Sequence, residues 1–176
     1  MSKVVDDTEI CIRCILTPLF FSERKKKLRR EAFLPPAGRR DVSLLRLRYT
    51  DLTRCKQHAK SLRIGDNLYS GLASIMKSDV ADAYNDESVI DRDTFSVDVV
   101  YSPMSENGDY LSSDVDVYSD AKGLPMHADL MYASEAAPNE IQTQMRKFAN
   151  VLKGKARFQE DEDPDNPEWT GGDFYR

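Results

Sequence analysis

Apolar and polar positions follow one another along the chain in a pattern that predicts four strands. Residues 9–16 are rich in β-branched side chains and end before Pro18, which is typical of a strand. Residues 42–49 and 95–101 alternate between apolar and polar positions, as a half-buried strand does. Residues 125–132 would return beside the strand at 95–101.

The strand at residues 42–49 is predicted to have a basic outer face. From Leu45 onward its apolar residues Leu45, Leu47 and Tyr49 share one side, and Arg46 and Arg48 share the other. Because side chains of a strand alternate between its two faces, we expect both arginines to face solvent.

One helix is strongly predicted near the C-terminus. Within residues 139–153 the apolar side chains recur at helical spacing and form the stripe that packs a helix on a sheet: Ile141, Met145, Phe148, Ala149 and Leu152. Gly154 stands where a C-terminal cap belongs.

Two shorter helices and one ambiguous segment complete the pattern. Thr50 or Asp51 would cap a helix that ends near Leu62, and residues 78–84 suit a helical turn. Residues 69–76 fit a strand or a helix equally well. The sequence thus predicts a single α+β domain with a mixed or antiparallel sheet of four to five strands and about three helices.

Two further segments are expected to lie outside this regular framework. Residues 105–125 form a long polar excursion, in which residues 114–118 would be a short edge strand. Residues 159–176 are strongly acidic, so the domain is expected to cover 1–158 and to be followed by a tail without fixed structure.

Composition supports a globular protein. The chain has 176 residues, of which 40% are hydrophobic and 31% charged. Its longest uncharged apolar stretch, residues 15–21, is far shorter than the ~20 residues that span a bilayer, so we expect no membrane partner. The first residues lack the pattern of a secretory signal, which leads us to expect a cytoplasmic protein.

The net charge of −5 conceals a strong asymmetry. Residues 24–63 carry a net charge of +11 and residues 64–176 one of −14. The candidate binding residues are the basic side chains of the first of these segments: Arg24, Lys25, Lys26, Lys27, Arg29, Arg30, Arg39 and Arg40. Such a run can bind phosphates, although no aromatic residue interleaves it as in single-strand binders. It can equally be a solvated loop that the acidic tail neutralises.

Three cysteines and a histidine make a formal zinc-ligand set, Cys11, Cys14, Cys55 and His58. However, Cys11 and Cys14 lie three apart in a predicted strand, so their side chains should point to opposite faces. We therefore expect reduced, packed cysteines, no metal and no cofactor.

His127 and Asp129 form the best catalytic candidate. Two residues apart in a strand, they share a face, where a carboxylate can orient an imidazole that acts as a base. Arg46 could then clamp an anion. A buried structural histidine satisfied by its neighbour would have the same pattern, and we prefer that interpretation. The common nucleotide-binding, hydrolase and metalloprotease motifs are missing from the sequence.

Four short motifs resemble a small family of uncharacterised prokaryotic proteins. They are Phe33-Leu-Pro-Pro36, Val42-Ser-Leu-Leu-Arg46, Gly71-Leu-Ala73 and His127-Ala-Asp-Leu-Met-Tyr132. The resemblance spans about residues 10–155. It implies a prokaryotic source, and no activity, cofactor or catalytic residue.

These observations favour a non-catalytic accessory or regulatory subunit that docks on a larger protein or complex. Two alternatives stay open: a small enzyme that uses His127 and Asp129, and a nucleic-acid-binding module that uses residues 24–40.

Overall fold

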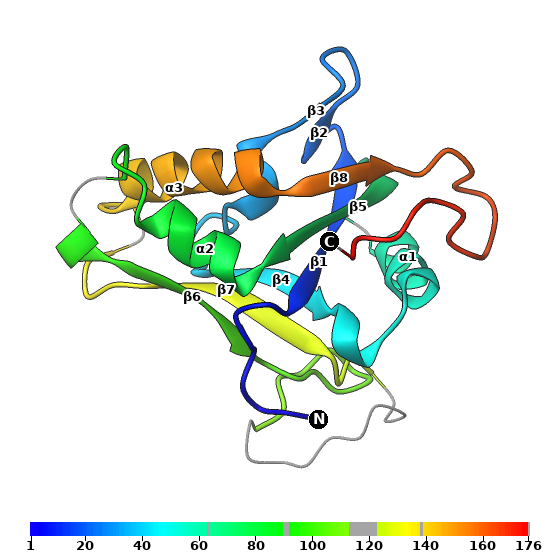
Figure 1. Ribbon diagram of the computed structural model, residues 1–176, viewed down its shortest axis with the longest axis horizontal. Coiled ribbons are helices and arrows are strands. Elements are labelled where there is room, and N and C mark those ends of the chain that lie inside the picture. Colours follow the sequence, from blue (N-terminus) through cyan, green and yellow to red (C-terminus); the bar gives the residue numbers. More distant parts are fainter. Residues whose placement is uncertain (63, 90–91, 113–122, 138, 176) are drawn as a thin grey trace.

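A six-stranded antiparallel sheet with the order β6-β7-β4-β1-β5-β8 forms the centre of the computed structural model, which describes residues 1–62, 64–89, 92–112, 123–137 and 139–175 (Figure 1). Its strands are β1 (Ile10–Thr17), β4 (Asp41–Arg46), β5 (Leu68–Met76), β6 (Ser96–Tyr101), β7 (His127–Ala133) and β8 (Arg157–Glu160). A separate hairpin consists of β2 (Phe21–Ser22) and β3 (Lys27–Leu28). The α+β class is confirmed, but the prediction of four to five strands was wrong.

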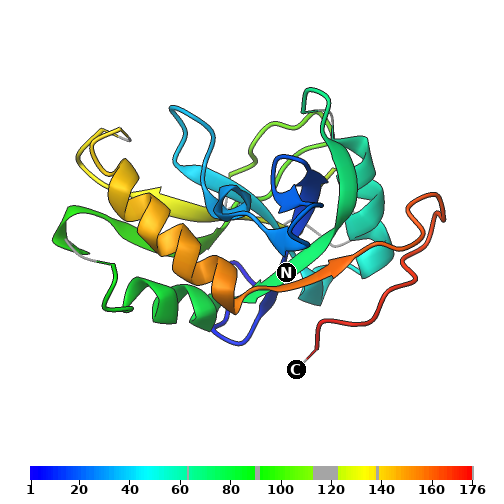
Figure 2. The same ribbon diagram turned by 90° about the horizontal axis from the view of Figure 1, so that it is seen from above.

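Three α-helices in the described part of the chain confirm the predicted number. They are α1 (Leu52–Ser61), α2 (Lys77–Tyr84) and α3 (Gln142–Lys155), and the 3-10 turns are η1 (Arg30–Phe33), η2 (Leu47–Tyr49) and η3 (Arg92–Thr94). Figure 2 shows α2 and α3 on one side of the sheet and α1 on the other. Asp51 caps α1 by accepting a hydrogen bond from the Arg54 amide at 2.8 Å. The predicted cap at Gly154 was wrong, because α3 continues to Lys155 and its C-cap is Ala156.

The alternation of side chains along the strands divides the interior into two cores. The larger core lies beneath α2 and α3 and includes Leu44, Leu130 and Phe148. The smaller core lies beneath α1 and includes Ile12 and Leu45. Neighbouring residues of β4 therefore belong to different cores, as the period of a strand requires.

The prediction of a basic outer face on residues 42–49 was wrong. Strand β4 ends at Arg46, and residues 47–49 form a 3-10 turn instead of continuing the alternation. Arg46 is fully buried, because the Glu9 carboxylate pairs with its guanidinium at 2.6 Å. Arg48 alone of the two arginines is exposed, and it pairs with Asp6 at the surface.

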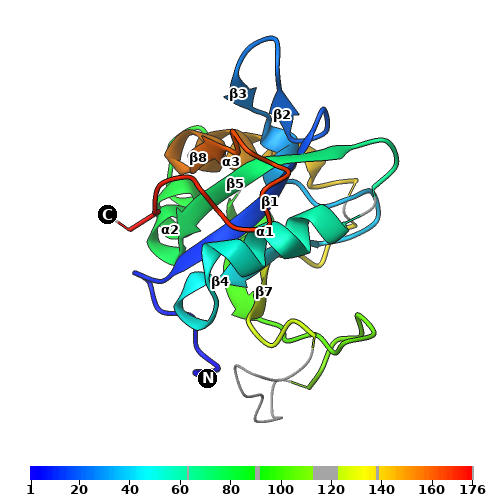
Figure 3. The same cartoon turned by 90° about the vertical axis from the view of Figure 1, so that its right-hand side faces the viewer.

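The acidic C-terminal residues differ from the structureless tail that their composition suggested. Residues 157–160 form an edge strand on β5, where a Cβ at Gly71 would lie 2.2 Å from the Gln159 carbonyl oxygen, so only glycine permits this close approach. Beyond it, the chain returns along α1 (Figure 3), and Phe174 is buried in the smaller core with Trp169 against it.

Two further expectations from the sequence concern an edge strand at residues 114–118 and membrane-spanning helices. The predicted edge strand at 114–118 lies outside the described residues. In the part of the chain that is described, none of the helices has both the length and the apolar character needed to cross a membrane.

Candidate functional site

The β2–β3 hairpin and the residues that follow it, 21–30, project from the body of the protein and are called the basic hairpin below (Figures 1 and 3). The Phe21 side chain is buried and packs on Phe158 of β8 at a ring-centroid distance of 4.7 Å, which anchors the base of the hairpin. Lys26 has a φ of 49°, the left-handed conformation that lets the chain turn back. The anchored base and the tight turn hold the charged side chains away from the core.

Three cations of the basic hairpin make no ion pair with any described residue: Arg24, Lys25 and Lys27. Lys26 pairs with Glu160 at 2.9 Å, and Arg29 and Arg30 approach the single carboxylate of Glu31 at 3.5 and 3.4 Å. All these pairs are exposed, so each contributes little. The acidic C-terminal residues pack along α1, and among those that the structure describes only Glu160 pairs with the hairpin.

A concave surface of about 790 Å³ lies along the basic hairpin. Two carboxylates line it, Glu23 and Glu31. Six cations line it as well: Arg24, Lys25, Lys27, Arg29, Arg30 and Lys153. Lys153 comes from α3, so the fold adds a cation that the linear run of residues 24–30 does not contain. The surface is therefore suited to an anionic partner.

Arg39 and Arg40, which the sequence grouped with the basic run, have separate structural partners. Arg39 forms a two-pronged pair with Asp41, with a shortest distance of 2.6 Å. Arg40 donates hydrogen bonds to the carbonyl oxygens of Ser134 and Ala136, at 2.5 and 2.6 Å. The predicted basic segment thus splits into the exposed basic hairpin, in which three cations lack an ion pair with any described residue, and two arginines with intramolecular roles.

His127 and Asp129 lie side by side on β7, with 3.8 Å between the imidazole Nε2 and a carboxylate oxygen. Both side chains are 1% exposed. The histidine Nδ1 lies 2.8 Å from the carbonyl oxygen of Ser102, which can only accept a hydrogen bond, so the proton is assigned to Nδ1. In the neutral ring Nε2 can then only accept a hydrogen bond, and it faces the Asp129 carboxylate oxygen, which also only accepts.

Neither Nε2 of His127 nor Oδ1 of Asp129 has a hydrogen-bond partner in the described part of the chain. Burial lowers the pKa of His127 and outweighs the opposite effect of Asp129. The ring is therefore neutral at pH 7. It borders a cavity of about 180 Å³, together with His58, Arg13 and apolar side chains.

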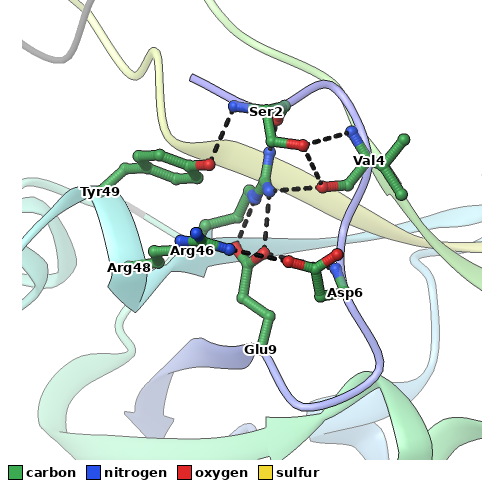
Figure 4. A network of polar contacts seen from close by, with 7 residues as sticks. All are labelled: Ser2, Val4, Asp6, Glu9, Arg46, Arg48 and Tyr49. Carbon is green, nitrogen blue, oxygen red and sulfur yellow. Dashed lines mark hydrogen bonds and ion pairs between the residues drawn. The ribbon is translucent and has the colours of Figure 1, made fainter.

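Arg46 takes no part in the arrangement around His127. Its neighbour Leu45 lies opposite His127 in the sheet, so Arg46 points to the other face. There it donates to both carboxylate oxygens of Glu9 and to the carbonyl oxygens of Ser2 and Val4 (Figure 4). The idea that Arg46 clamps an anion beside His127 was wrong, because the guanidinium lies on the other face of the sheet and holds the N-terminal segment.

The candidate metal ligands are distributed over the two cores. Cys11 packs in the larger core, and Cys14 packs in the smaller one with Cys55, whose carbonyl oxygen lies 3.9 Å from the Cys14 sulfur. All three cysteines are free and buried, and burial raises the pKa of Cys11 and of Cys14 to about 12. Among the described residues, no group of three or more histidine, cysteine, aspartate or glutamate side chains is placed to hold a metal ion.

Sequence reasoning missed two cations, of which one is buried and one half-buried. Lys56 of α1 pairs with Asp161 at 2.8 Å, both side chains being completely buried, and it also donates to the carbonyl oxygens of Asp163 and Glu168. Arg13 lies in the middle of β1, beside two cavities. For Arg13 a signal existed, since a charged residue inside an otherwise apolar strand is unusual.

No family model, curated protein or solved structure matches this chain.

Proposed function

We propose that the protein is a non-catalytic cytoplasmic binding protein that docks on an acidic surface of a larger partner protein. The observation that carries this proposal is the basic hairpin, where Arg24, Lys25 and Lys27 are exposed and make no ion pair with any described residue. Unpaired cations on a projecting element attract an anionic surface and orient its approach.

The burial of His127 and Asp129 supports a non-catalytic role. A general base must come within hydrogen-bond reach of the proton it removes, and both side chains are 1% exposed. His127 borders a cavity of only about 180 Å³, below the ~300 Å³ at which small-molecule sites usually begin, so an enzyme that used it would have to widen this cavity.

An acidic protein surface suits the hairpin better than a nucleic acid does. Duplex DNA carries a charge about every 1.7 Å, so its charge would continue past the hairpin over a body whose residues 64–176 have a net charge of −14. Single strands need aromatic platforms, yet Phe20 and Phe21 beside the basic run are only 7% and 1% exposed. A protein patch can match the hairpin in size.

The test is a binding titration with defined polyanions: polyglutamate, duplex DNA and single-stranded RNA. The variant R24E/K25E/K27E reverses the three unpaired cations. The control K3E/R48E/R157E reverses three exposed cations elsewhere and changes the net charge by the same amount.

We expect the parent to bind polyglutamate more tightly than either nucleic acid, with an affinity that falls as salt is added. The hairpin variant should bind at least tenfold more weakly, and the control should bind like the parent. Equal losses in both variants would mean that net charge alone decides. If the parent binds DNA or RNA more tightly than polyglutamate, its partner is a nucleic acid and not an acidic protein.

A further inference from the structure

Arg13 carries a charge that no carboxylate pairs with in the described part of the chain. Its Nε donates to the carbonyl oxygen of Ala32 at 2.8 Å, and one terminal nitrogen donates to that of Ser43 at 3.1 Å. The guanidinium also lies over the Phe20 ring, 4.6 Å from its centroid. A guanidinium has five N–H donors, so these contacts leave about three for a ligand.

Arg13 is half-buried. Burial lowers its pKa to about 10, still well above neutral pH, and the negative charge of the buried Asp129 opposes this effect. Asp129 forms no ion pair with Arg13, so the guanidinium keeps donors and a positive charge that would favour a directly bound anion at this place.

A cavity of about 490 Å³ adjoins Arg13, within the size range of small-molecule sites. Much of its wall is apolar, from Leu19, Phe20, Leu34, Pro35, Pro36 and Ile64. These side chains come from the segment after β1, the Pro-Pro connection and the loop after α1. The cavity is thus built by the tertiary fold.

The charges around this cavity do not balance. It is bordered by four arginines, Arg13, Arg30, Arg39 and Arg146, and by two carboxylates, Glu31 and Asp41. Asp41 is engaged by Arg39 at 2.6 Å and Glu31 by Arg30 at 3.4 Å. Arg13 and Arg146 form no ion pair in the described part of the chain.

We propose that this cavity binds a small monocarboxylic acid with an apolar body, whose carboxylate pairs with Arg13. The carboxylate would pair directly with Arg13 in a planar geometry that matches a guanidinium. The apolar body would cover the leucine, phenylalanine and proline wall, which inorganic phosphate would leave exposed to water. The site is separate from docking by Arg24, Lys25 and Lys27, so either proposal can fail alone.

The experiment measures the binding of three probes to the full chain by calorimetry: octanoate, its neutral amide octanamide, and inorganic phosphate. The variant R13M keeps an unbranched apolar side chain and removes the charge, and R13K keeps the charge without the planar fork. R48M is the matched control, because Arg48 is exposed and lies outside this cavity.

We expect octanoate to bind the parent at least tenfold more tightly than octanamide or phosphate. R13M should lose at least tenfold in octanoate affinity and no longer prefer the acid to the amide, whereas R48M should behave like the parent. Equal affinity for octanoate and octanamide would reduce the site to an apolar cavity and overturn the proposal. So would phosphate binding as tight as octanoate binding, or unchanged binding by R13M. R13K keeps the charge and should still prefer octanoate to octanamide. If R13M does not fold, the three-probe comparison on the parent still decides.

Discussion

The buried pair between Glu9 and Arg46 should be one of the most sensitive points of the fold. The side chains are 2% and 0% exposed, and the guanidinium binds both carboxylate oxygens, at 2.6 and 2.9 Å (Figure 4). Burial alone would lower the pKa of Arg46, but the hydrogen bonds and charge of Glu9 outweigh it and raise the pKa above its usual value. Arg46 therefore stays charged in the folded protein.

Replacing Glu9 by Gln leaves this buried guanidinium without its counter-charge. Breaking a buried pair in this way costs about 3–5 kcal/mol of unfolding free energy. For a chain of this size each kcal/mol lowers the melting temperature by about 2–4 °C, so E9Q should melt roughly 6–20 °C below the parent. Urea unfolding would give the free energy directly.

The control is D6N, the same acid-to-amide change in the neighbouring pair with Arg48. That pair has a similar distance, 2.7 Å, but its side chains are 53% and 58% exposed. Its loss should cost at most about 1 kcal/mol. If E9Q and D6N lose the same unfolding free energy, the argument that burial sets the strength of these ion pairs is refuted.

A double variant separates the charge from the packing. E9M/R46M removes both charges and keeps side chains of similar length, so it should recover much of the stability lost in E9Q. It also removes the bonds to the carbonyl oxygens of Ser2 and Val4, and amide hydrogen exchange of residues 1–6 should accelerate. A double variant less stable than E9Q would contradict this account.

Three other perturbations test the remaining buried groups. Burial alone would raise the pKa of Asp161, but the hydrogen bonds from Lys56 and a tyrosine hold it below its usual value. D161N should therefore be less stable than the parent at pH 7. The two stabilities should converge as the pH falls below about 4, where the carboxylate of the parent becomes protonated. Urea titrations across this range would measure the difference. F174A should cost about 3–5 kcal/mol, and the emission of Trp169, the single tryptophan, should shift to the red as the C-terminal residues leave the smaller core. Because burial lowers the pKa of His127, the unfolded chain binds an extra proton below about pH 6.5, and the parent loses stability there. The unfolding free energy of H127Q should therefore depend less on pH between pH 7.5 and 5.5. An unchanged slope of unfolding free energy against pH would contradict a buried neutral ring.

Sequence reasoning went furthest where the signal was local. Alternating side chains located β6, and the apolar stripe of residues 141–152 located α3, because each pattern reflects one face of one element in contact with one core. The same reasoning placed Cys11 and Cys14 on opposite faces of β1, and the structure assigns them to different cores. The basic hairpin was visible as a run of charge, although its shape was not.

The errors concern side chains whose environment depends on distant partners. Arg46 was assigned to an exposed face, yet it is buried and pairs with Glu9, which lies 37 residues away in the chain. The C-terminal residues were expected to lack structure because acidic composition disfavours a core. That rule is an average over many side chains, and here Asp161 meets Lys56 while Phe174 fills a space beneath α1.

By itself, the sequence determined the α+β class, the positions of four of the six sheet strands and of the three described α-helices, and the location of the strongest positive charge. These properties follow from the spacing of side chains along one element and need no knowledge of its neighbours. The tertiary structure alone decided which charges are paired. It satisfied Arg46 and Lys56 and engaged Arg39 and Arg40, and in the described part of the chain it left Arg13 and three cations of the basic hairpin without an ion pair. The physical reason is that an ion pair depends on a distance of a few ångströms between atoms, and residues far apart in the chain acquire such distances only when the sheet assembles.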